Sequence, residues 1–286
     1  MVMTTLGDIS KKTVSGEAIL GGTIPRKVRV EHFVPRPELR TYYYPRRPAK
    51  DDGCGNARSE EHQHSLELML SPEVFSPSAH GLFLLDHLVV HPGERVIDIG
   101  TGTGIFAIAA ASVLGTRVSA TDISDKAIAL AEDNARRNGV IIHLSVGSYF
   151  SQFNEKYDLI IANLPQEIIP STYRSAIGEE LASTISGGEE GTAQMLELLD
   201  VAQEHMHQNS HLLMMVYSVS NYRDTIQKIL ANYTARIVAM DEGPVKEFVE
   251  DNAAEYWKLN QEGKISIFQK GSRIYASVFL LELILK

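Results

Sequence analysis

The sequence predicts a doubly wound α/β fold, in which helices cover both faces of a mostly parallel sheet. From about residue 79 onward, short apolar segments alternate with segments of helical periodicity, which is the order of elements in a parallel sheet. The last apolar segment, 272–284, returns without a helix before it. That departure suggests an antiparallel strand inserted near the sheet edge.

Seven segments are expected to form the strands of this Rossmann-like sheet. The first, Arg95–Ile99, is a nearly continuous apolar run, as a buried parallel strand requires. The other six are 117–123, 141–146, 157–162, 211–219, 235–240 and 272–284, and 265–269 would form a hairpin with the last. Helices are expected at 104–114, 125–138, 192–207, 221–233 and 245–261. Ser124 would cap the second of these helices and Gly139 would end it.

Composition indicates an ordinary globular protein of 286 residues, with 44% hydrophobic and 22% charged residues. A single cysteine, Cys54, excludes an internal disulfide framework and favours a reducing compartment. No apolar run approaches the roughly 18 to 20 residues of a membrane span, so no membrane partner is expected. Asp8 and other polar residues stand where a secretory signal would need an apolar core. We therefore expect a cytoplasmic protein.

The N-terminal region differs from the rest of the chain. Residues 1–65 are rich in proline and tyrosine and carry 11 Lys/Arg against 8 Asp/Glu, although the whole chain has a net charge of −9. This overall charge makes a nucleic-acid partner unlikely. We expect residues 1–65 to form a small irregular extension and 66–286 to form one domain, with helical residues 245–261 inserted into it. The extension, with its Tyr42–Tyr44 run, and the insertion would form either a lid over a substrate or a packing or homodimer surface.

A glycine-rich turn follows the first strand. Gly100, Gly102 and Gly104 form a Gly-x-Gly-x-Gly pattern where, in doubly wound sheets, ligands bind at the carboxyl ends of the strands. The dinucleotide fingerprint would place its third glycine at Ile105. The turn therefore predicts a nucleoside ligand without a pyrophosphate, and Thr101 lies within it.

Two acidic residues flank this turn. Asp122 lies near the end of the second strand, 18 residues after Gly104, where a carboxylate can accept hydrogen bonds from both ribose hydroxyls. The alternative role for Asp122, capping the next helix, suits Ser124 better. Asp98 lies inside the first strand and is costly to bury without partners. We expect it to hold the turn or to face an ammonium group of the ligand.

Asn163-Leu164-Pro165-Gln166 follows the fourth strand, at the same edge of the sheet as the glycine turn. An Asn side chain offers an acceptor and two donors, which suits orientation of a planar nitrogen substrate. Pro165 stiffens the loop, so that the preceding carbonyls keep one direction. The position predicts an acceptor site beside the nucleoside.

The segments VIDIGTGTGIFAIAA, ATDIS and DLIIANLPQE together resemble class I methyltransferases, which use S-adenosylmethionine (SAM). The resemblance is greatest to the release-factor glutamine methyltransferase group (HemK type) and covers about residues 65–286. That group carries Asn-Pro-Pro-Tyr where this chain has Asn163–Gln166, a Gly-Gly-x-x-Gly stretch similar to 187–191, and a Phe-x-Pro motif similar to Phe75–Pro77. The resemblance implies SAM as cofactor and no metal. Residues expected to bind it are Phe75, Asp98, Gly100, Thr101, Gly102, Gly104, Asp122, Ile123, Ser148, Tyr149 and Asn163.

The chain departs from the group at three of these places. Leu164 replaces the first proline, Gln166 replaces the tyrosine, and Ser148 stands where an acidic residue often contacts the adenine amine. The N-terminal extension also lacks the pattern of the helical bundle that recognises a release factor. These departures favour a relative that has kept the scaffold and Asn163 but changed its acceptor.

Three functions remain open at this point. The first is N-methylation of a small molecule, peptide or protein side chain, with Asn163, Pro165 and Gln166 at the acceptor. The second is O-methylation of a hydroxyl or carboxylate, which needs a base; among several histidines, His80 is the first to test because it follows the Phe75–Ser78 segment. The third is a SAM-binding regulatory protein without catalysis.

Overall fold

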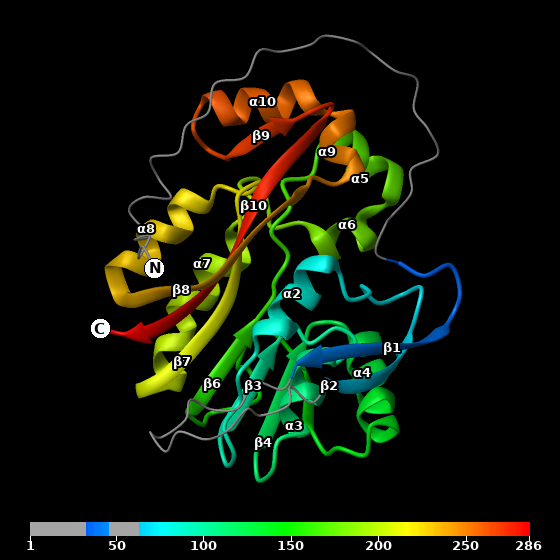
Figure 1. The fold of residues 1–286 in the computed structure, drawn as a ribbon, viewed down its shortest axis with the longest axis vertical. Helices are drawn as coiled ribbons and strands as arrows, with labels where there is room; N and C mark the ends of the chain where they lie inside the picture. The colour runs from blue at the N-terminus through cyan, green and yellow to red at the C-terminus, as the bar shows by residue number, and fades with distance from the viewer. Residues whose placement is uncertain (1–32, 46–62) are drawn as a thin grey trace. The chain divides into compact units, whose positions relative to one another are not determined.

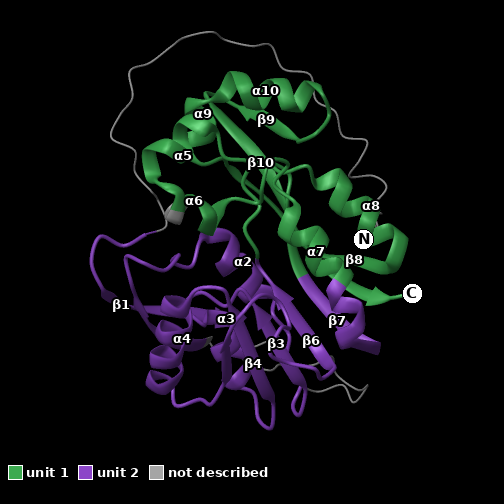
Figure 2. Cartoon of the chain, turned by 180° about the vertical axis from the view of Figure 1, so that it is seen from behind, with its two compact units in different colours: residues 1–30, 164–200, 214–286 green, residues 31–163, 201–213 purple. Residues whose placement is uncertain are grey.

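The structure, a computed structural model, describes residues 33–45 and 63–286 (Figure 1). Two compact units are found in the chain (Figure 2). Residues 31–163 and 201–213 belong to the N-terminal unit, and residues 164–200 and 214–286 belong to the C-terminal unit. The predictions made for Asp8 and Cys54 lie outside the described residues.

The N-terminal unit is built on a parallel sheet. Its strands are β3 (Arg95–Ile99), β4 (Arg117–Asp122), β5 (His143–Val146), β6 (Tyr157–Ala162) and the first part of β7 (Met206–Tyr217). Their order is β5-β4-β3-β6-β7, and β3 pairs in parallel with both β4 and β6. The central position of β3 explains its continuous apolar run, since Val96 and Ile97 are fully buried.

Three helices pack around these strands: α2 (Ala79–His87), α3 (Ile105–Ala111) and α4 (Asp125–Arg137). The expected cap of α4 is confirmed, because the Ser124 hydroxyl accepts a hydrogen bond from Ala127 N at 3.2 Å. Helix α3 is shorter than expected. It ends at Ala111, and Gly115, with φ of +78°, turns the chain toward β4.

A hairpin of β1 (Glu38–Pro45) and β2 (Gln63–Leu70) belongs to the same unit. The predicted boundary between residues 65 and 66 thus falls inside β2, and the expected irregular extension contributes a strand. Tyr42 and Tyr44 are buried whereas Tyr43 is exposed, which is the period-two alternation of a strand with one packed face. Two of the three tyrosines in this run therefore serve packing.

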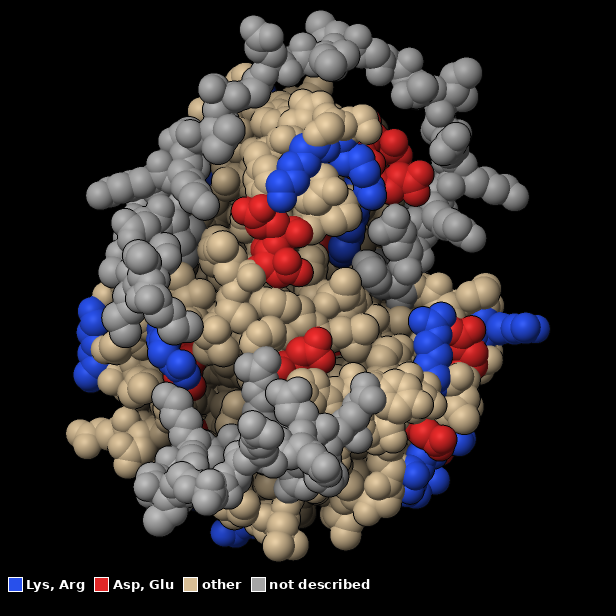
Figure 3. All heavy atoms as spheres, in the orientation of Figure 1, with Lys and Arg blue, Asp and Glu red and all other residues tan. Residues whose placement is uncertain are grey.

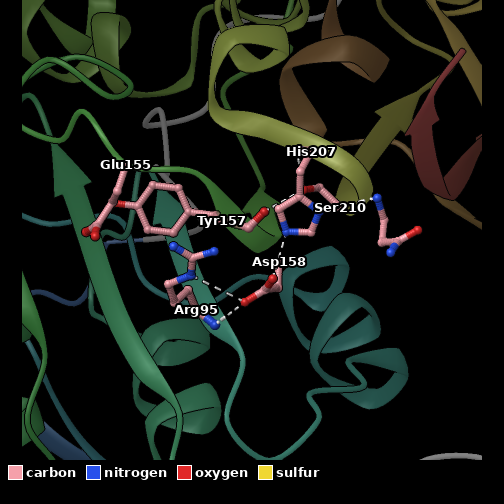
Figure 4. A network of polar contacts seen from close by, with 7 residues as sticks. Arg95, Glu155, Tyr157, Asp158, His207 and Ser210 are labelled. Atoms are coloured by element: carbon pink, nitrogen blue, oxygen red, sulfur yellow. Dashed lines mark hydrogen bonds and ion pairs between the residues drawn. The ribbon is translucent and has the colours of Figure 1, made fainter.

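A polar network joins the amino-terminal ends of β3, β6 and β7 (Figure 4). Asp158 accepts hydrogen bonds from Arg95 N at 2.8 Å and pairs with His207 Nε2 at 2.7 Å. Ser210 Oγ donates to Tyr157 O at 2.6 Å and accepts from His207 N at 2.8 Å. Burial alone would raise the pKa of Asp158, but the hydrogen bonds from Arg95 and His207 hold it below its ordinary value.

The C-terminal unit contains the antiparallel strands. Its elements are α5 (Ser171–Ile177), α6 (Glu179–Ile185), α7 (Ala193–Val201), the rest of β7, α8 (Tyr222–Asn232), β8 (Tyr233–Pro244), α9 (Glu247–Asp251), α10 (Ala253–Gln261), β9 (Ile267–Lys270) and β10 (Arg273–Leu285). The strand order is β7-β10-β8, and β10 runs antiparallel to β8 and to β9. This confirms the predicted fold, a mostly parallel sheet with an antiparallel last strand. The sheet has eight strands where seven are predicted, because the hairpin strand β9 pairs with β10.

The structure differs from the sequence prediction around β7. The expected helix 192–207 ends at Val201, a short 3₁₀ helix follows, and β7 begins at Met206 instead of residue 211. Residues 207–210 are polar, yet Ser210 bonds to the backbone of Tyr157 on the neighbouring strand. Long-range pairing of this kind overrides local polarity, which had argued against a strand.

Charged side chains on the described surface lie in small groups of mixed sign on the face seen in Figure 3. The ion pairs of the described residues include Lys126 with Glu73 and Arg137 with Asp133. No helix among the described residues combines the length and apolar character needed to cross a bilayer.

Candidate active site

The glycine turn joins β3 to α3 and takes a conformation that only glycine adopts readily. Gly100, Gly102 and Gly104 have φ of 72°, 54° and 86°, all in the left-handed region. Gly100 N and Thr101 N both donate to Thr121 O, at 2.8 and 3.0 Å, so the turn is tied to the end of β4. The sequence requirement for glycine is therefore conformational at all three positions.

Two of these glycines have different surroundings. A Cβ at Gly104 would lie 3.1 Å from Ala131 Cβ and 3.2 Å from Ile108 Cδ1, so this position needs glycine for the close approach of α3 and α4. At Gly102 the nearest atom of a described residue would be Phe75 O, 3.9 Å away. The face of the turn at Gly102 is open, as a nucleoside site requires.

Asp98 is fully buried beneath the turn. Its Oδ2 accepts hydrogen bonds from Thr101 Oγ1 at 2.6 Å and from Ala107 N at 3.2 Å, whereas its Oδ1 has no partner among the described residues. Burial is the main reason why the pKa of Asp98 is raised to about 7. The two hydrogen bonds lower this pKa and the nearby charge of Asp122 raises it, but each of these effects is smaller than that of burial. Asp98 thus holds the turn with one oxygen and leaves a second, buried acceptor for a ligand.

Asp122 supports the same turn from the end of β4. One of its oxygens accepts from Gly102 N at 2.9 Å and the other from Ser124 N at 3.0 Å. Burial raises the pKa of this carboxyl, and the backbone hydrogen bonds oppose that shift. Because a carboxylate has further lone pairs, the predicted contact with ribose hydroxyls remains open to Asp122.

Ile123, Ser148 and Tyr149 lie on loops that follow β4 and β5. Ile123 is 74% exposed, which leaves its side chain free to cover a flat ring. Thr121 Oγ1 donates to Tyr149 O at 2.8 Å, and Gly147 N donates to Asp122 O at 2.9 Å. Tyr149 has φ of 49° and is the only non-glycine residue in the described part of the chain with a positive value. This strained loop is thereby held next to Asp122.

Asn163 stands at the carboxyl end of β6, beside the glycine turn. Ala162 pairs with Ile99 in the parallel register, so Asn163 and Gly100 occupy equivalent places on neighbouring strands. The Asn163 side chain is partly exposed and forms no hydrogen bond with any described residue. A Cβ on Gly81 of α2 would lie 3.5 Å from Asn163 Nδ2.

The segment Phe75–Ser78 leads from β2 into α2. Phe75 packs edge-to-face on Phe33 with ring centroids 5.8 Å apart, and Ser78 Oγ accepts from Gly81 N as the cap of α2. His80 lies in the first turn of α2, one residue before Gly81. The predicted cofactor residues all lie within the N-terminal unit, together with Asn163 and His80.

Pro165 and Gln166 belong to the C-terminal unit. The Gln166 side chain is buried, donates from Nε2 to Met215 O at 3.0 Å and accepts at Oε1 from Tyr217 N at 2.9 Å. The side-chain amide of Gln166 thus forms the two hydrogen bonds that the backbone of a neighbouring strand would form with β7. Both of its polar atoms are bonded to backbone atoms of β7. The catalytic roles predicted for Pro165 and Gln166 stay predictions, and the contacts of Gln166 are those of a positioning residue.

The Gly-Gly-x-x-Gly stretch supports the same loop. A Cβ at Gly191, whose φ is +71°, would lie 2.6 Å from Gln166 O, and one at Gly187 would lie 2.4 Å from Gly191 O. Gly187 N donates to Glu167 O and Glu167 N donates to Ile185 O. These glycines therefore permit close packing of the loop that follows Asn163.

Sequence reasoning missed two positioning groups. Asn134 of α4 is fully buried, donates to Met69 O and Thr103 O and accepts from Met69 N. Glu167 and Lys246 form an ion pair at 2.5 Å with both side chains largely buried. Asn134 could have been noticed in the sequence, because a polar residue on the buried face of an amphipathic helix needs hydrogen-bond partners. The ion pair joins residues 79 positions apart, and no sequence pattern indicates it.

The described residues hold no cluster of three His, Cys, Asp or Glu side chains suited to a metal. The polar atoms of the site suit SAM instead. The open glycine turn fits a nucleoside, and the unpartnered Asp98 Oδ1 fits an ammonium donor of its amino-acid part.

Comparison with known proteins agrees with this fit. Residues 78–187 match the family model of the ribosomal protein L11 methyltransferase (PrmA). A protein of Methanocaldococcus jannaschii with the provisional name protein N5-glutamine methyltransferase is 27% identical over 195 residues, which are 68% of this chain and 96% of that protein. The release factor glutamine methyltransferase of Gloeobacter violaceus is 30% identical over 59% of this chain and 63% of that protein.

The ribosomal protein L11 methyltransferase of Caldicellulosiruptor bescii is 46% identical, but over only 28% of this chain and 26% of that protein. The chain thus spans nearly all of the first relative, under two thirds of the second and about a quarter of the third. Fold, site and relatives together define the class: the chain is a class I methyltransferase that uses SAM. Two of these relatives are named as glutamine methyltransferases.

Proposed function

We propose that the protein transfers the methyl group of SAM to the side-chain amide nitrogen of a glutamine in a peptide or protein. The observation that carries this proposal is Asn163. Its amide lies at the end of β6 beside the glycine turn, is partly exposed, and is not used by any described residue. A free amide at this place can pair with another amide.

Asn163 would act by orientation. Its Oδ1 accepts a hydrogen bond from one N–H of the acceptor amide, and its Nδ2 is free to donate. SAM supplies an activated methyl group on a positively charged sulfur, so the protein mainly has to align the nitrogen with that carbon. Such alignment contributes on the order of 7–11 kcal/mol to a reaction of two bound partners. The carbon–sulfur bond breaks as the nitrogen–carbon bond forms, and S-adenosylhomocysteine leaves. The N-methylated amide then loses its extra proton to water, and because a protonated amide is strongly acidic, this step needs no strong base in the site.

The relatives support the chemical class of the acceptor. Two of them, from M. jannaschii and G. violaceus, are named for methylation of glutamine in proteins.

The test compares Asn163→Ala with Asn138→Ala, which removes an amide of the same unit that binds the backbone of Glu67 instead. Each variant is incubated with SAM carrying a deuterated methyl group and with purified release factor, ribosomal protein L11 or a glutamine-containing peptide. Mass spectrometry then locates the methyl group. We expect labelled glutamine amide, at least ~100-fold slower turnover for Asn163→Ala, and little change in affinity for S-adenosylhomocysteine (SAH). Methylation at an amine or oxygen would reject the amide acceptor.

O-methylation is the second candidate, and the position of His80 is what favours it. His80 lies in the first turn of α2, next to Gly81, where a Cβ would lie 3.5 Å from Asn163 Nδ2. A hydroxyl acceptor would need a base near neutral pH, which a histidine can supply. Under the amide proposal, His80→Gln keeps turnover within about threefold, whereas loss of roughly 100-fold would favour the hydroxyl acceptor.

A further inference from the structure

Ser76 is a buried hydroxyl that the fold does not use. Its side chain is 5% exposed, and its Oγ has no hydrogen-bond partner among the described residues. Other buried serines of the same unit are satisfied: Ser210 Oγ, for example, both donates to Tyr157 O and accepts from His207 N. An unsatisfied buried hydroxyl destabilises the folded protein, so the burial of Ser76 indicates a hydrogen-bond partner that the described residues do not provide.

The position of Ser76 indicates where that partner lies. The residue before it, Phe75, places its carbonyl oxygen 3.9 Å from where a Cβ at Gly102 would stand. Five residues after it, Gly81 lies against the Asn163 amide, at 3.5 Å from a Cβ built on Gly81 to Nδ2. The segment that carries Ser76 therefore runs from the open face of the glycine turn to the residue proposed to orient the acceptor. A cofactor bound at the glycine turn with its methyl group toward Asn163 would follow this path along the segment.

A second unpartnered atom lies at the start of this path. Asp98 Oδ1 is fully buried and lacks a donor, while Oδ2 of the same carboxylate is satisfied. The two atoms differ in chemistry: a carboxylate oxygen only accepts, whereas a hydroxyl can donate. The amino-acid part of SAM carries one group for each, an ammonium that only donates and a carboxylate that only accepts.

We infer that Ser76 binds the α-carboxylate of SAM through its hydroxyl, while Asp98 Oδ1 accepts from the α-ammonium. The inference concerns the cofactor and does not depend on the proposed acceptor. A hydroxyl that donates to a carboxylate forms a charge-assisted hydrogen bond, which is among the stronger ones. Phe75 and Ser78, on either side, would hold the segment by ring packing and by capping α2.

Two serine variants and two ligands test this assignment. Ser76→Ala removes the unpartnered hydroxyl, and Ser210→Ala, the matched control, removes a satisfied one at the opposite ends of the strands. The ligands are SAH, which keeps the amino-acid part, and 5′-methylthioadenosine, which lacks it. Isothermal titration calorimetry gives the dissociation constants, and thermal unfolding with and without SAH gives stability and its increase on binding.

We expect opposite behaviour of the two variants. Ser76→Ala keeps or raises the melting temperature without ligand, weakens SAH binding by about 10- to 100-fold and leaves methylthioadenosine binding within about twofold. Ser210→Ala lowers the melting temperature and leaves both affinities unchanged. Equal weakening of both ligands by Ser76→Ala would overturn the assignment to the carboxylate. Unchanged SAH affinity would overturn any contact between Ser76 and the cofactor.

Discussion

Replacing Asp98 with asparagine tests the buried carboxylate beneath the glycine turn. The pKa of about 7 stands about three units above the ordinary value of 3.8. Each unit corresponds to about 1.4 kcal/mol, so ionising Asp98 in the folded protein costs about 4 kcal/mol. Between roughly pH 4 and pH 7 the folded protein holds a proton that the unfolded chain has lost, and the free energy of unfolding therefore falls as the pH rises through this window.

Asp98→Asn removes this charge but keeps the shape. One polar atom of the new side chain can still accept from Thr101 and Ala107, and its NH₂ takes the place of the unpartnered Oδ1. An unsatisfied NH₂ costs about 1–3 kcal/mol, which is less than the buried charge. Without ligand, the variant should therefore be about 1–3 kcal/mol more stable than the natural protein at pH 8. The difference should disappear or change sign near pH 4.

Urea denaturation between pH 4 and pH 8 measures this difference, and calorimetry with SAH measures its functional cost. A donor cannot pair with the ligand's ammonium, so SAH affinity at pH 8 should drop about 10- to 100-fold. The same variant is thus expected to be more stable and to bind less well. A variant less stable than the natural protein at pH 8 would refute the buried-charge argument, and undiminished SAH affinity would refute the contact with the ammonium.

Four further predictions concern the glycine turn, the polar network around Asp158 and the loop that follows Asn163. Gly104→Ala should lower the free energy of unfolding by about 2–4 kcal/mol in urea titrations, because the left-handed φ and the contact with α4 both oppose a Cβ. Gly102→Val should instead abolish SAH binding, and unaltered binding would contradict the assignment of the glycine turn as the cofactor site. Since the pKa of Asp158 is lowered, its contribution to stability should be present above about pH 4 and lost below it, so Asp158→Asn should flatten the acid limb of unfolding midpoints measured from pH 3 to 6. Gln166→Leu should cost about 2–4 kcal/mol by leaving two backbone groups of β7 unpaired, with SAH affinity unchanged; an unaffected midpoint would show that this amide does not hold the loop.

Features that depend on neighbouring residues could be predicted from the sequence. The apolar run of β3, the glycines after it and the Ser124 cap each express a local requirement for burial, φ or hydrogen bonding. Asp98 could be recognised as a functional candidate because burying a carboxylate inside an apolar strand is costly unless the carboxylate has hydrogen-bond partners. The antiparallel last strand could be inferred because no helix precedes it.

Features that depend on distant partners could not be predicted. Gln166 was expected at the acceptor, but its amide bonds to β7 backbone about fifty residues further along the chain. The prolines of residues 24–50 suggest extended segments and turns, but they do not identify β2 as the pairing partner of residues 38–45, and the one proline in that strand is Pro45 at its end. The sequence assigns no role to Ser76, and only its burial without a partner among the described residues marks it as a candidate binding residue.

Asn134 has a consequence for protein engineering. Its single side chain joins β2 at Met69 to the glycine turn at Thr103, through three hydrogen bonds from the last turn of α4. A chimera that exchanged residues 100–104 alone would place the new loop against an Asn134 and a β2 that belong to a different sequence. The smallest exchangeable cassette for cofactor specificity therefore runs from β2 through α4, and recombination breakpoints placed before Met69 and after α4 should preserve function better than any breakpoint between them.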